Sequence, residues 1–198
     1  MTPKQRRTQL LDVGEELFDG GRFDELSMEE IAGHADVTRA LLYHYFPTKA
    51  EFFGAVWQRA HESILPVADL RDSSTVRDWL IDALTKYLAF YEQHPNLVLI
   101  ANRSSIAAAP AVREPVATTF GVIGRAALDA AGCAGTNRRL AEASFRGWIA
   151  LVRETTGLAL IEHDLTPDEN LRICIHALDA TVGQHAELSA RPAAPTDH

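Results

Sequence analysis

Residues 27–49 constrain the fold more than any other stretch, because they carry signals for two short helices with a sharp turn between them. Ser27 and Glu30 have the spacing of a capping box, in which each side chain accepts a hydrogen bond from the backbone N–H of the other residue. This box predicts a helix that begins at Met28. The helix must end early, because Asp36 follows soon after it, and aspartate tolerates the left-handed conformation of a tight turn.

A second short helix follows the turn. Thr38 can cap its N-terminus, and Pro47 ends it. Leu42 and Phe46 lie one helical turn apart and therefore share a face, which we expect to pack inward. Two helices joined in this way predict a helix-turn-helix, and a helix this short depends on packing against its neighbours for stability.

The opposite face of the second helix is predicted to be exposed. It carries Arg39, Leu41, Tyr43 and Tyr45, and a recognition helix presents such a face to the major groove of DNA. An ordinary helical hairpin is the alternative. The following residues favour DNA binding, because another capping box begins at Thr48 and places free backbone N–H groups beside the predicted groove.

The run of residues 37–49 resembles the signature of the tetracycline-repressor (TetR) family of bacterial transcription regulators, and the resemblance extends over roughly residues 8–60. Beyond them only length and helical pattern agree. Three positions depart from the usual family pattern: Asp36 replaces a turn glycine, Ala40 a frequent glycine and Leu41 a frequent threonine. The first change should be tolerated, whereas the other two alter which bases are read.

The resemblance implies a DNA-binding surface. Thr38, Tyr43 and Lys49 are expected to hold phosphates, whereas Arg39 and Leu41 face base edges. The two arginines near the N-terminus could add phosphate contacts or serve only as a solubilising arm. The complete predicted set is Arg6, Arg7, Thr38, Arg39, Ala40, Leu41, Tyr43, His44, Tyr45 and Lys49.

The whole chain is predicted to be helical, so the expected fold class is all-α. Apolar residues recur at helical spacing, capping signals and prolines bound the helices, and no stretch calls for a strand. Beyond the helix-turn-helix, we expect helices at 3–19, 48–61, 76–93, 97–108, 110–131, 137–162 and 166–189. The expected regions are a helix-turn-helix domain at 1–47, a connecting helix at 48–65, a ligand-binding and dimerisation domain at 66–190, and a disordered tail at 191–198.

The last two predicted helices carry stripes of apolar and small residues. Such stripes are more often plain core than interface. The resemblance to TetR proteins, which dimerise through a four-helix bundle of their last two helices, favours a homodimer interface here. Its predicted members are Ala143, Gly147, Leu151, Leu158, Ile175, Leu178 and Val182.

The resemblance also implies a pocket for a small, at least partly apolar organic effector. Arg103 is the most informative candidate, because a buried arginine needs an acidic partner or an anionic ligand, although it could simply be exposed or salt-bridged. The other candidates are each, taken alone, more typical of core than of ligand contact. The predicted lining is Leu84, Tyr87, Tyr91, Ile100, Arg103, Phe120, Phe145 and Trp148.

Composition limits the other classes of function. The net charge of −8 argues against indiscriminate nucleic-acid binding, and residues 1–60 alone carry ten Asp and Glu against seven Lys and Arg. The two cysteines form neither a disulfide framework nor a zinc knuckle, and no helix carries a close pair of histidines, so we expect no metal and no cofactor. No apolar run approaches the ~18 residues of a membrane-spanning helix, and a signal peptide is not evident, so we expect a cytoplasmic protein without membrane contact.

No nucleophile elbow, phosphate-binding glycine loop or paired Cys and His ligands occur, which predicts that the chain is not an enzyme. We expect a ligand-responsive transcriptional regulator, a repressor, that binds a palindromic operator in double-stranded DNA as a homodimer and is released by an effector. The alternative is a helical ligand-binding or protein-binding module that has lost operator binding, which the acidic N-terminal region favours.

Overall fold

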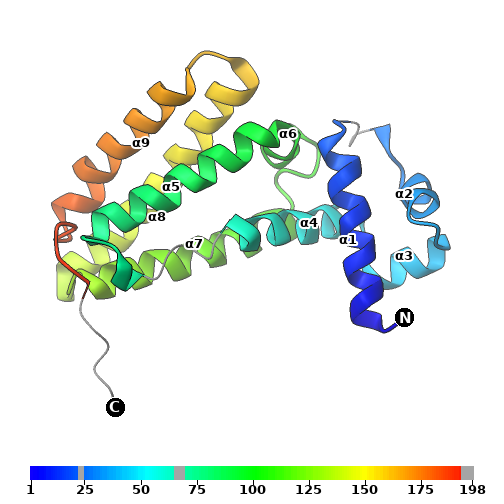
Figure 1. Ribbon diagram of the computed structural model, residues 1–198, viewed down its shortest axis with the longest axis horizontal. Coiled ribbons are helices and arrows are strands. Elements are labelled where there is room, and N and C mark those ends of the chain that lie inside the picture. The colour runs from blue at the N-terminus through cyan, green and yellow to red at the C-terminus, as the bar shows by residue number, and fades with distance from the viewer. Residues whose placement is uncertain (22–24, 65–69, 193–198) are drawn as a thin grey trace. The chain divides into compact units, whose positions relative to one another are not determined.

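A computed structural model describes residues 1–21, 25–64 and 70–192 of the 198-residue chain. Every regular element within these ranges is a helix, which confirms the all-α prediction (Figure 1). The described residues divide into two compact units. We call Met1–Ser63 with His94–Ala117 the N-terminal unit, and Ile64–Gln93 with Thr118–His198 the C-terminal unit.

The N-terminal unit contains the helix-turn-helix. Its helices are α1 (Pro3–Asp19), α2 (Met28–His34), α3 (Arg39–Tyr45), α4 (Lys49–Ile64), α6 (Pro95–Arg103) and the first residues of α7 (Pro110–Ala130). The last residue of α4 is assigned to the other unit. Aromatic rings form its core: the centroid of Phe18 lies 5.5 Å from that of Phe52 and 5.4 Å from that of Phe53, and Phe46 lies 4.9 Å from Phe52. These contacts join α1, α4 and the residue that ends α3.

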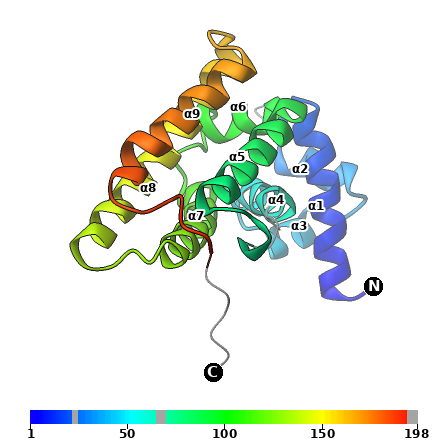
Figure 2. The same ribbon diagram turned by 60° about the vertical axis from the view of Figure 1, so that its left-hand side comes forward.

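The C-terminal unit packs α5 (Val76–Gln93), the rest of α7, α8 (Gly135–Gly157) and α9 (Pro167–Thr181). The helices α8 and α9 lie side by side in both ribbon views (Figures 1 and 2) and make the most extensive contact between helices in the described ranges. Arg77 on α5 donates two hydrogen bonds of 2.7 Å to the carboxylate of Asp179 on α9. The side chains of this pair are about one-third to two-fifths exposed, so the pair fixes orientation more than it adds stability.

The local signals in the sequence are present as hydrogen bonds. Complete capping boxes join Thr2 with Gln5, Ser27 with Glu30, and Thr166 with Glu169. The Thr48 hydroxyl accepts from the Glu51 N–H and donates to its carboxylate, both at 3.1 Å. Asp36 has the predicted left-handed conformation, with φ of 50°.

Several predicted helix ends are wrong. The final helix was expected to reach residue 189, but α9 ends at Thr181, and a 3-10 turn, Val182–Gln184, follows it. The chain turns because residues 188–190 pair with the start of α5, where the Arg77 N–H donates to the Leu188 carbonyl at 2.8 Å. The helix expected at 97–108 covers Pro95–Arg103. The helix expected at 137–162 does end at Glu162, but its last turn, Leu158–Glu162, is π-helical.

The predicted domain boundaries also differ from the two compact units. The region expected at 66–190 includes α6 and the first turns of α7, yet both cluster with the helix-turn-helix. The reason is packing: Asn96 on α6 donates its side-chain amide to the Asp19 carbonyl at 2.5 Å, and His94 lies 3.1 Å from the Asp19 carboxylate. Residues 65–69, where the expected connecting helix meets the expected ligand-binding domain, and residues 193–198 of the expected tail lie outside the described residues.

Gly54 allows α4 to approach the start of α7. A Cβ atom at this position would collide with the carbonyl oxygen of Ala111 and lie 2.8 Å from its carbonyl carbon. We expect Gly54→Ala to lower the free energy of unfolding by about 1–3 kcal/mol, because backbone atoms must move to admit the methyl group. Urea denaturation followed by circular dichroism measures this change.

Gly33→Ala is the matched control, since nothing lies within 4 Å of its added Cβ on α2. It should raise stability by up to about 1 kcal/mol through helix propensity. Equal effects of the two substitutions would contradict the close approach at Gly54.

Candidate nucleic-acid interface and ligand pocket

The turn between α2 and α3 is closed by local hydrogen bonds. The Val37 N–H donates to the Ala32 carbonyl at 3.0 Å, and the hydroxyl of Thr38 accepts from the Leu41 N–H at 3.2 Å. Leu42 is fully buried, so α3 packs on the side predicted from its spacing with Phe46. The other side of α3 is left to face outward.

The predicted DNA-binding residues lie on or beside that outward side. Thr38, Arg39, Ala40 and His44 are exposed. The remaining members from this region are partly exposed: Leu41, Tyr43, Tyr45 and, at the first position of α4, Lys49. The structure therefore gathers on one short helix and its two flanks all the predicted residues except the arginines of α1.

Arg39 is held from two sides. Its Nη1 atom lies 3.4 Å from Oε2 of Glu29 on α2, and its guanidinium carbon lies 5.3 Å from the centroid of the Tyr43 ring. Glu29 is not among the residues predicted for this surface. Its place in the first turn of α2 gives no local signal for a contact across the turn.

Arg7 contacts the end of α3. Its guanidinium carbon lies 5.4 Å from the centroid of the Phe46 ring, in the geometry of a cation–π interaction. Arg6 donates a hydrogen bond of 2.8 Å to the side chain of Gln9 on the same helix. Arg7 is exposed, and its contact with Phe46 is compatible with both predictions for the two arginines, a phosphate contact and a solubilising arm.

The partly buried side chain of Arg59 links α4 to α1. Its guanidinium donates hydrogen bonds of 2.8 Å to Glu15 and 2.8 Å to Asp12. Burial alone would lower the pKa of Arg59, but the two carboxylates outweigh burial, and the pKa is raised. This cluster has no signal in the sequence, because Arg59 is far along the chain from Asp12 and Glu15.

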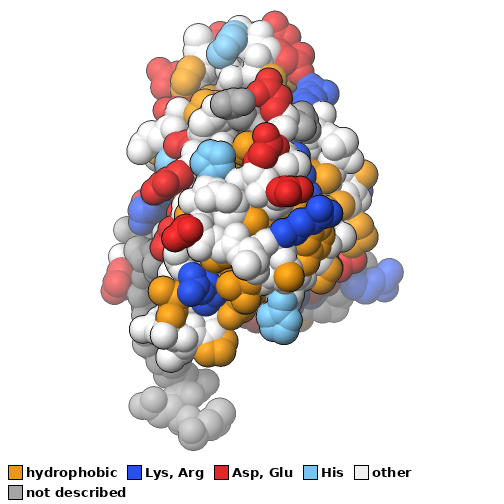
Figure 3. Space-filling view, turned by 90° about the vertical axis from the view of Figure 1, so that its right-hand side faces the viewer, with side chains coloured by type: hydrophobic (Ala, Val, Ile, Leu, Met, Phe, Trp, Pro, Cys, Tyr) orange, Lys and Arg blue, Asp and Glu red, His pale blue; other side chains and the backbone are white. Residues whose placement is uncertain are grey.

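Charges of both signs share the surface of the molecule. Figure 3 shows acidic, basic and apolar side chains interspersed on the face that it presents. The pairing of Glu29 with Arg39 repeats this pattern on a scale of two residues. A surface of this kind offers no broad positive field, so any attraction to DNA would depend on individually placed contacts.

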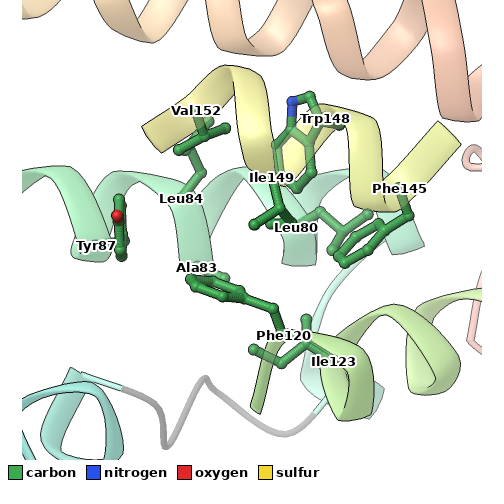
Figure 4. Close-up of a pocket in the computed structure, with 10 residues that line it drawn as sticks. All are labelled: Leu80, Ala83, Leu84, Tyr87, Phe120, Ile123, Phe145, Trp148, Ile149 and Val152. Atoms are coloured by element: carbon green, nitrogen blue, oxygen red, sulfur yellow. The ribbon is translucent and has the colours of Figure 1, made fainter. Parts of the chain in front are cut away.

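An apolar pocket lies within the C-terminal unit, between α5, α7 and α8 (Figure 4). Its cavity volume is about 30 Å³. A bound molecule must therefore displace aromatic side chains to enter fully. The lining residues are Leu80, Ala83, Leu84, Tyr87, Phe120, Ile123, Phe145, Trp148, Ile149 and Val152.

The polar groups of the lining are either hydrogen-bonded within the protein or uncharged. Trp148 donates its indole N–H to the Cys174 carbonyl at 2.8 Å. Burial raises the pKa of Tyr87, so its phenol stays protonated, and its ring packs edge-on against Tyr91 at 4.6 Å and Phe120 at 5.8 Å. Among the described lining residues, the pocket thus offers apolar surface and no charged side chain.

The structure brings together only part of the predicted lining. Leu84, Tyr87, Phe120, Phe145 and Trp148 line the pocket. Tyr91 is buried one turn beyond Tyr87, whereas Ile100 and Arg103 belong to α6 in the N-terminal unit. Arg103 is exposed, so the hypothesis of a buried arginine that requires an anionic ligand is wrong.

The missed lining residues follow from helix geometry. Leu80 and Ala83 on α5, Ile123 on α7, and Ile149 and Val152 on α8 lie one residue or one turn from residues that were predicted. Helical spacing would have found them had the candidates been extended along each helix.

The predicted dimer residues divide into two groups. Ala143 and Gly147 are exposed, and Leu151, Leu158 and Ile175 are partly exposed, so these five are available to a partner. Leu178 and Val182 are fully buried within the chain and cannot form an interface surface, because α9 and the turn after it pack them inward. Two large apolar side chains on the same helices are exposed instead, Leu140 by 44% and Ile173 by 37%.

No group of three or more His, Cys, Asp or Glu residues in the described ranges is arranged to hold a metal ion. Cys133 and Cys174 are free thiols. Within the same ranges, no helix combines the length and the apolar character required to cross a bilayer.

The region that contains the helix-turn-helix is similar to known regulatory proteins. The family model described as "Bacterial regulatory proteins, tetR family" matches residues 10–56, from α1 into α4. The nucleoid occlusion factor SlmA of Haemophilus influenzae is 28% identical over 102 residues, which cover 50% of this chain and 47% of SlmA. The HTH-type transcriptional activator FasR of Mycolicibacterium smegmatis is 32% identical over 90 residues, which cover 44% of this chain and 41% of FasR. The chain spans less than half the length of these curated relatives.

Solved structures match over nearly the whole chain. A tetR-family transcriptional regulator from Streptomyces coelicolor superposes with a TM-score of 0.73 and 26% identity, covering 93% of this chain and 83% of that one. A TetR transcriptional regulator from Rhodococcus sp. RHA1 gives a TM-score of 0.66 at 21% identity, covering 91% and 96%, and this likeness concerns the fold alone. The similarity in fold therefore extends well beyond the region matched by the family model.

Proposed function

We propose that the protein is a transcriptional regulator that binds operator DNA through α3, because residues 10–56 match the model of the TetR family of bacterial regulatory proteins. The observation that carries the proposal is the outward face of α3, exposed opposite the buried Leu42. Leu42 fixes the rotation of the helix, so the same side always points outward. The proposed activity is binding rather than catalysis.

The types of side chain on this face suit the two kinds of DNA contact. Arg39 can donate two hydrogen bonds to guanine O6 and N7, and Leu41 suits the methyl group of thymine. Thr38, Tyr43 and Lys49 are proposed to hold phosphates, with the α4 N-terminus adding its backbone N–H groups. Arg6 and Arg7 on α1 are proposed to add further phosphate contacts.

The alternative function is a helical ligand-binding or protein-binding module without operator binding. The acidic composition of residues 1–60 favours it, since this region contains seven Lys and Arg but ten Asp and Glu. Selection from a random pool of duplex DNA tests the two proposals directly. Enrichment of one palindromic sequence supports the regulator, and a pool that stays random at low salt supports the alternative.

Two substitutions separate the proposed base contact from the proposed phosphate contact. Arg39→Ala should cost about 1–3 kcal/mol per half-site and relax the preference at one base position. Lys49→Ala should weaken binding to all sequences alike and reduce the salt slope by about one per subunit. Fluorescence anisotropy with an operator and its single-base variants, at several salt concentrations, measures both effects.

An Arg39→Ala protein that keeps both its affinity and its base preference would show that another face of α3, or another helix, reads the DNA. Thermal unfolding of each variant by circular dichroism controls for loss of structure.

We further propose that the protein forms a homodimer through the outward faces of α8 and α9. The exposed Leu140, Ala143, Gly147 and Ile173 supply apolar and small side chains on the two helices. A two-fold axis would place the same surface on both partners and two α3 helices on one duplex. Recognition helices about 34–36 Å apart reach successive major grooves, which gives a palindromic operator.

Gly147→Arg tests this interface. Nothing lies within 4 Å of a Cβ atom added at Gly147, so the arginine is accommodated in the monomer and obstructs only a partner. Light scattering of the unchanged protein should give about twice the chain mass of 21.8 kDa, and the variant should give the chain mass.

Val122→Arg is the control, because Val122 is 53% exposed on α7, outside the proposed interface. It should remain dimeric. A wild-type mass of one chain at all concentrations, or a dimeric Gly147→Arg protein, would refute the proposed interface.

We also propose that a neutral, largely apolar organic molecule binds the pocket between α5, α7 and α8 and releases the protein from DNA, as in a repressor. The apolar lining and the committed indole N–H of Trp148 support this class of ligand, since a charged group would lose its hydration without a partner. Release requires that the ligand prefer a conformation in which the two DNA-binding units are wrongly spaced. Moving the protein from mostly competent to mostly incompetent needs several kcal/mol of such preference.

Gly124→Ala tests the pocket. A Cβ atom there would lie 2.6 Å from Cδ1 of Phe145, so the ring must move within the pocket. Binding of a neutral apolar dye, followed by fluorescence, should weaken about tenfold or more. Gly121→Ala on the same helix should leave dye binding unchanged, because its Cβ meets only the end of the Arg125 side chain at 3.4 Å.

Release is measured separately, as operator affinity at saturating ligand. A compound that raises the melting temperature but leaves operator affinity unchanged would refute release while leaving the pocket intact.

A further inference from the structure

Glu29 and Arg39 form an ion pair in the middle of the proposed DNA-binding surface. Glu29 is in the first turn of α2, Arg39 is the first residue of α3, and their Oε2 and Nη1 atoms lie 3.4 Å apart. Both side chains are largely exposed, by 75% and 61%. An exposed pair of this kind adds little to folding stability, so stability alone does not explain the pair.

The contact restricts the arginine that is proposed to read a base. The Nη1 atom of Arg39 donates a hydrogen bond to Glu29, and the guanidinium carbon lies 5.3 Å from the centroid of the Tyr43 ring. Between them they limit the rotamers of a long side chain that otherwise loses considerable conformational entropy on binding. The Nε and Nη2 atoms of the guanidinium are left as the edge that can meet guanine O6 and N7.

The carboxylate also acts on the phosphates. If Arg39 reaches a base edge, then Glu29 lies within one side-chain contact of the DNA. A negative charge there repels the phosphate backbone and neutralises a cation that would otherwise bind any sequence. Both effects act against non-specific binding, whereas the positioning effect favours the correct base.

We propose that Glu29 is a specificity-determining residue of DNA recognition, which positions Arg39 for one base pair and lowers affinity for all other DNA. This inference rests on the proposed operator binding. It assigns to an acidic residue outside α3 a part of the sequence selectivity that would otherwise be attributed to α3 alone.

Two substitutions of Glu29 separate charge from position. Glu29→Gln removes the charge and keeps the shape, so affinity for random duplex should rise about two- to fivefold per subunit. The salt slope should steepen by up to about one per subunit, as Arg39 becomes available to phosphate. Glu29→Asp keeps the charge, but its side chain is one methylene shorter. Because Nη1 and Oε2 are already 3.4 Å apart, this variant should lose the contact with Arg39 without gaining affinity for random DNA.

Both variants should lower the preference for the base pair read by Arg39 by about three- to tenfold. Glu16→Gln is the matched control, because Glu16 is an exposed residue of α1 in the same unit and its loss makes the same change in net charge. It should change neither quantity. Anisotropy with the selected operator, its single-base variants and random duplex gives all the values, and circular dichroism at the assay temperature shows that each variant is folded.

The double variant Glu29→Gln with Arg39→Ala identifies the route of the effect. If Glu29 acts through Arg39, then Glu29→Gln has no effect on base preference once Arg39 is alanine. Unchanged base preference in both Glu29 variants, or an effect that persists in the Arg39→Ala background, would overturn the inference. These outcomes leave operator binding intact, whereas a wild-type protein without any sequence preference would overturn the proposed function itself.

Discussion

The burial of Leu42 and Phe46 is the constraint on which the proposed DNA-binding surface depends. The helix α3 has seven residues, and a helix of that length is not stable in water by itself. Leu42 is fully buried and Phe46 is 3% exposed, with its ring 4.9 Å from that of Phe52. These contacts set both the existence of α3 and its rotation, and the rotation decides which side chains face outward. Arg7 adds to the same anchor by stacking on Phe46, so one aromatic ring joins the starts of α1 and α4 to the end of α3.

Local chemistry made the helix-turn-helix predictable from the sequence. A capping box uses residues three apart, so Ser27 with Glu30 and Thr166 with Glu169 can be read from the chain alone. The same holds for Asp36, whose left-handed conformation depends mainly on its own backbone. Contacts between distant residues carried no such signal. The pairing of Arg59 with Asp12 and Glu15, and of α6 with the end of α1, follows from how whole helices pack.

The errors in the predicted sites have one physical cause, which is that periodicity identifies an apolar face but not what covers it. Leu178 and Val182 continue the stripe that includes Ile175, yet they are buried within the chain, whereas Ile173 on the next face of α9 is exposed. The ligand candidates show the same limit. Phe145 was recognisable as an inward aromatic residue, but its place in the pocket depends on Gly124, which lets its ring lie where a Cβ would otherwise be. Only the packed arrangement of α7 against α8 reveals that dependence.

The acidic character of the chain bears directly on how an α3 surface of this kind could select DNA. With a net charge of −8 and ten acidic against seven basic residues in 1–60, a general attraction to phosphate is weak. Non-specific affinity supplies no sequence information, so lowering it raises the ratio of specific to non-specific binding without any new base contact. The proposed role of Glu29 applies this reasoning at the scale of one side chain. The pairing would keep Arg39 in place for a base edge and would neutralise its charge toward random phosphate. A palindromic site read by two such surfaces would square the ratio, because each half-site contributes its own discrimination.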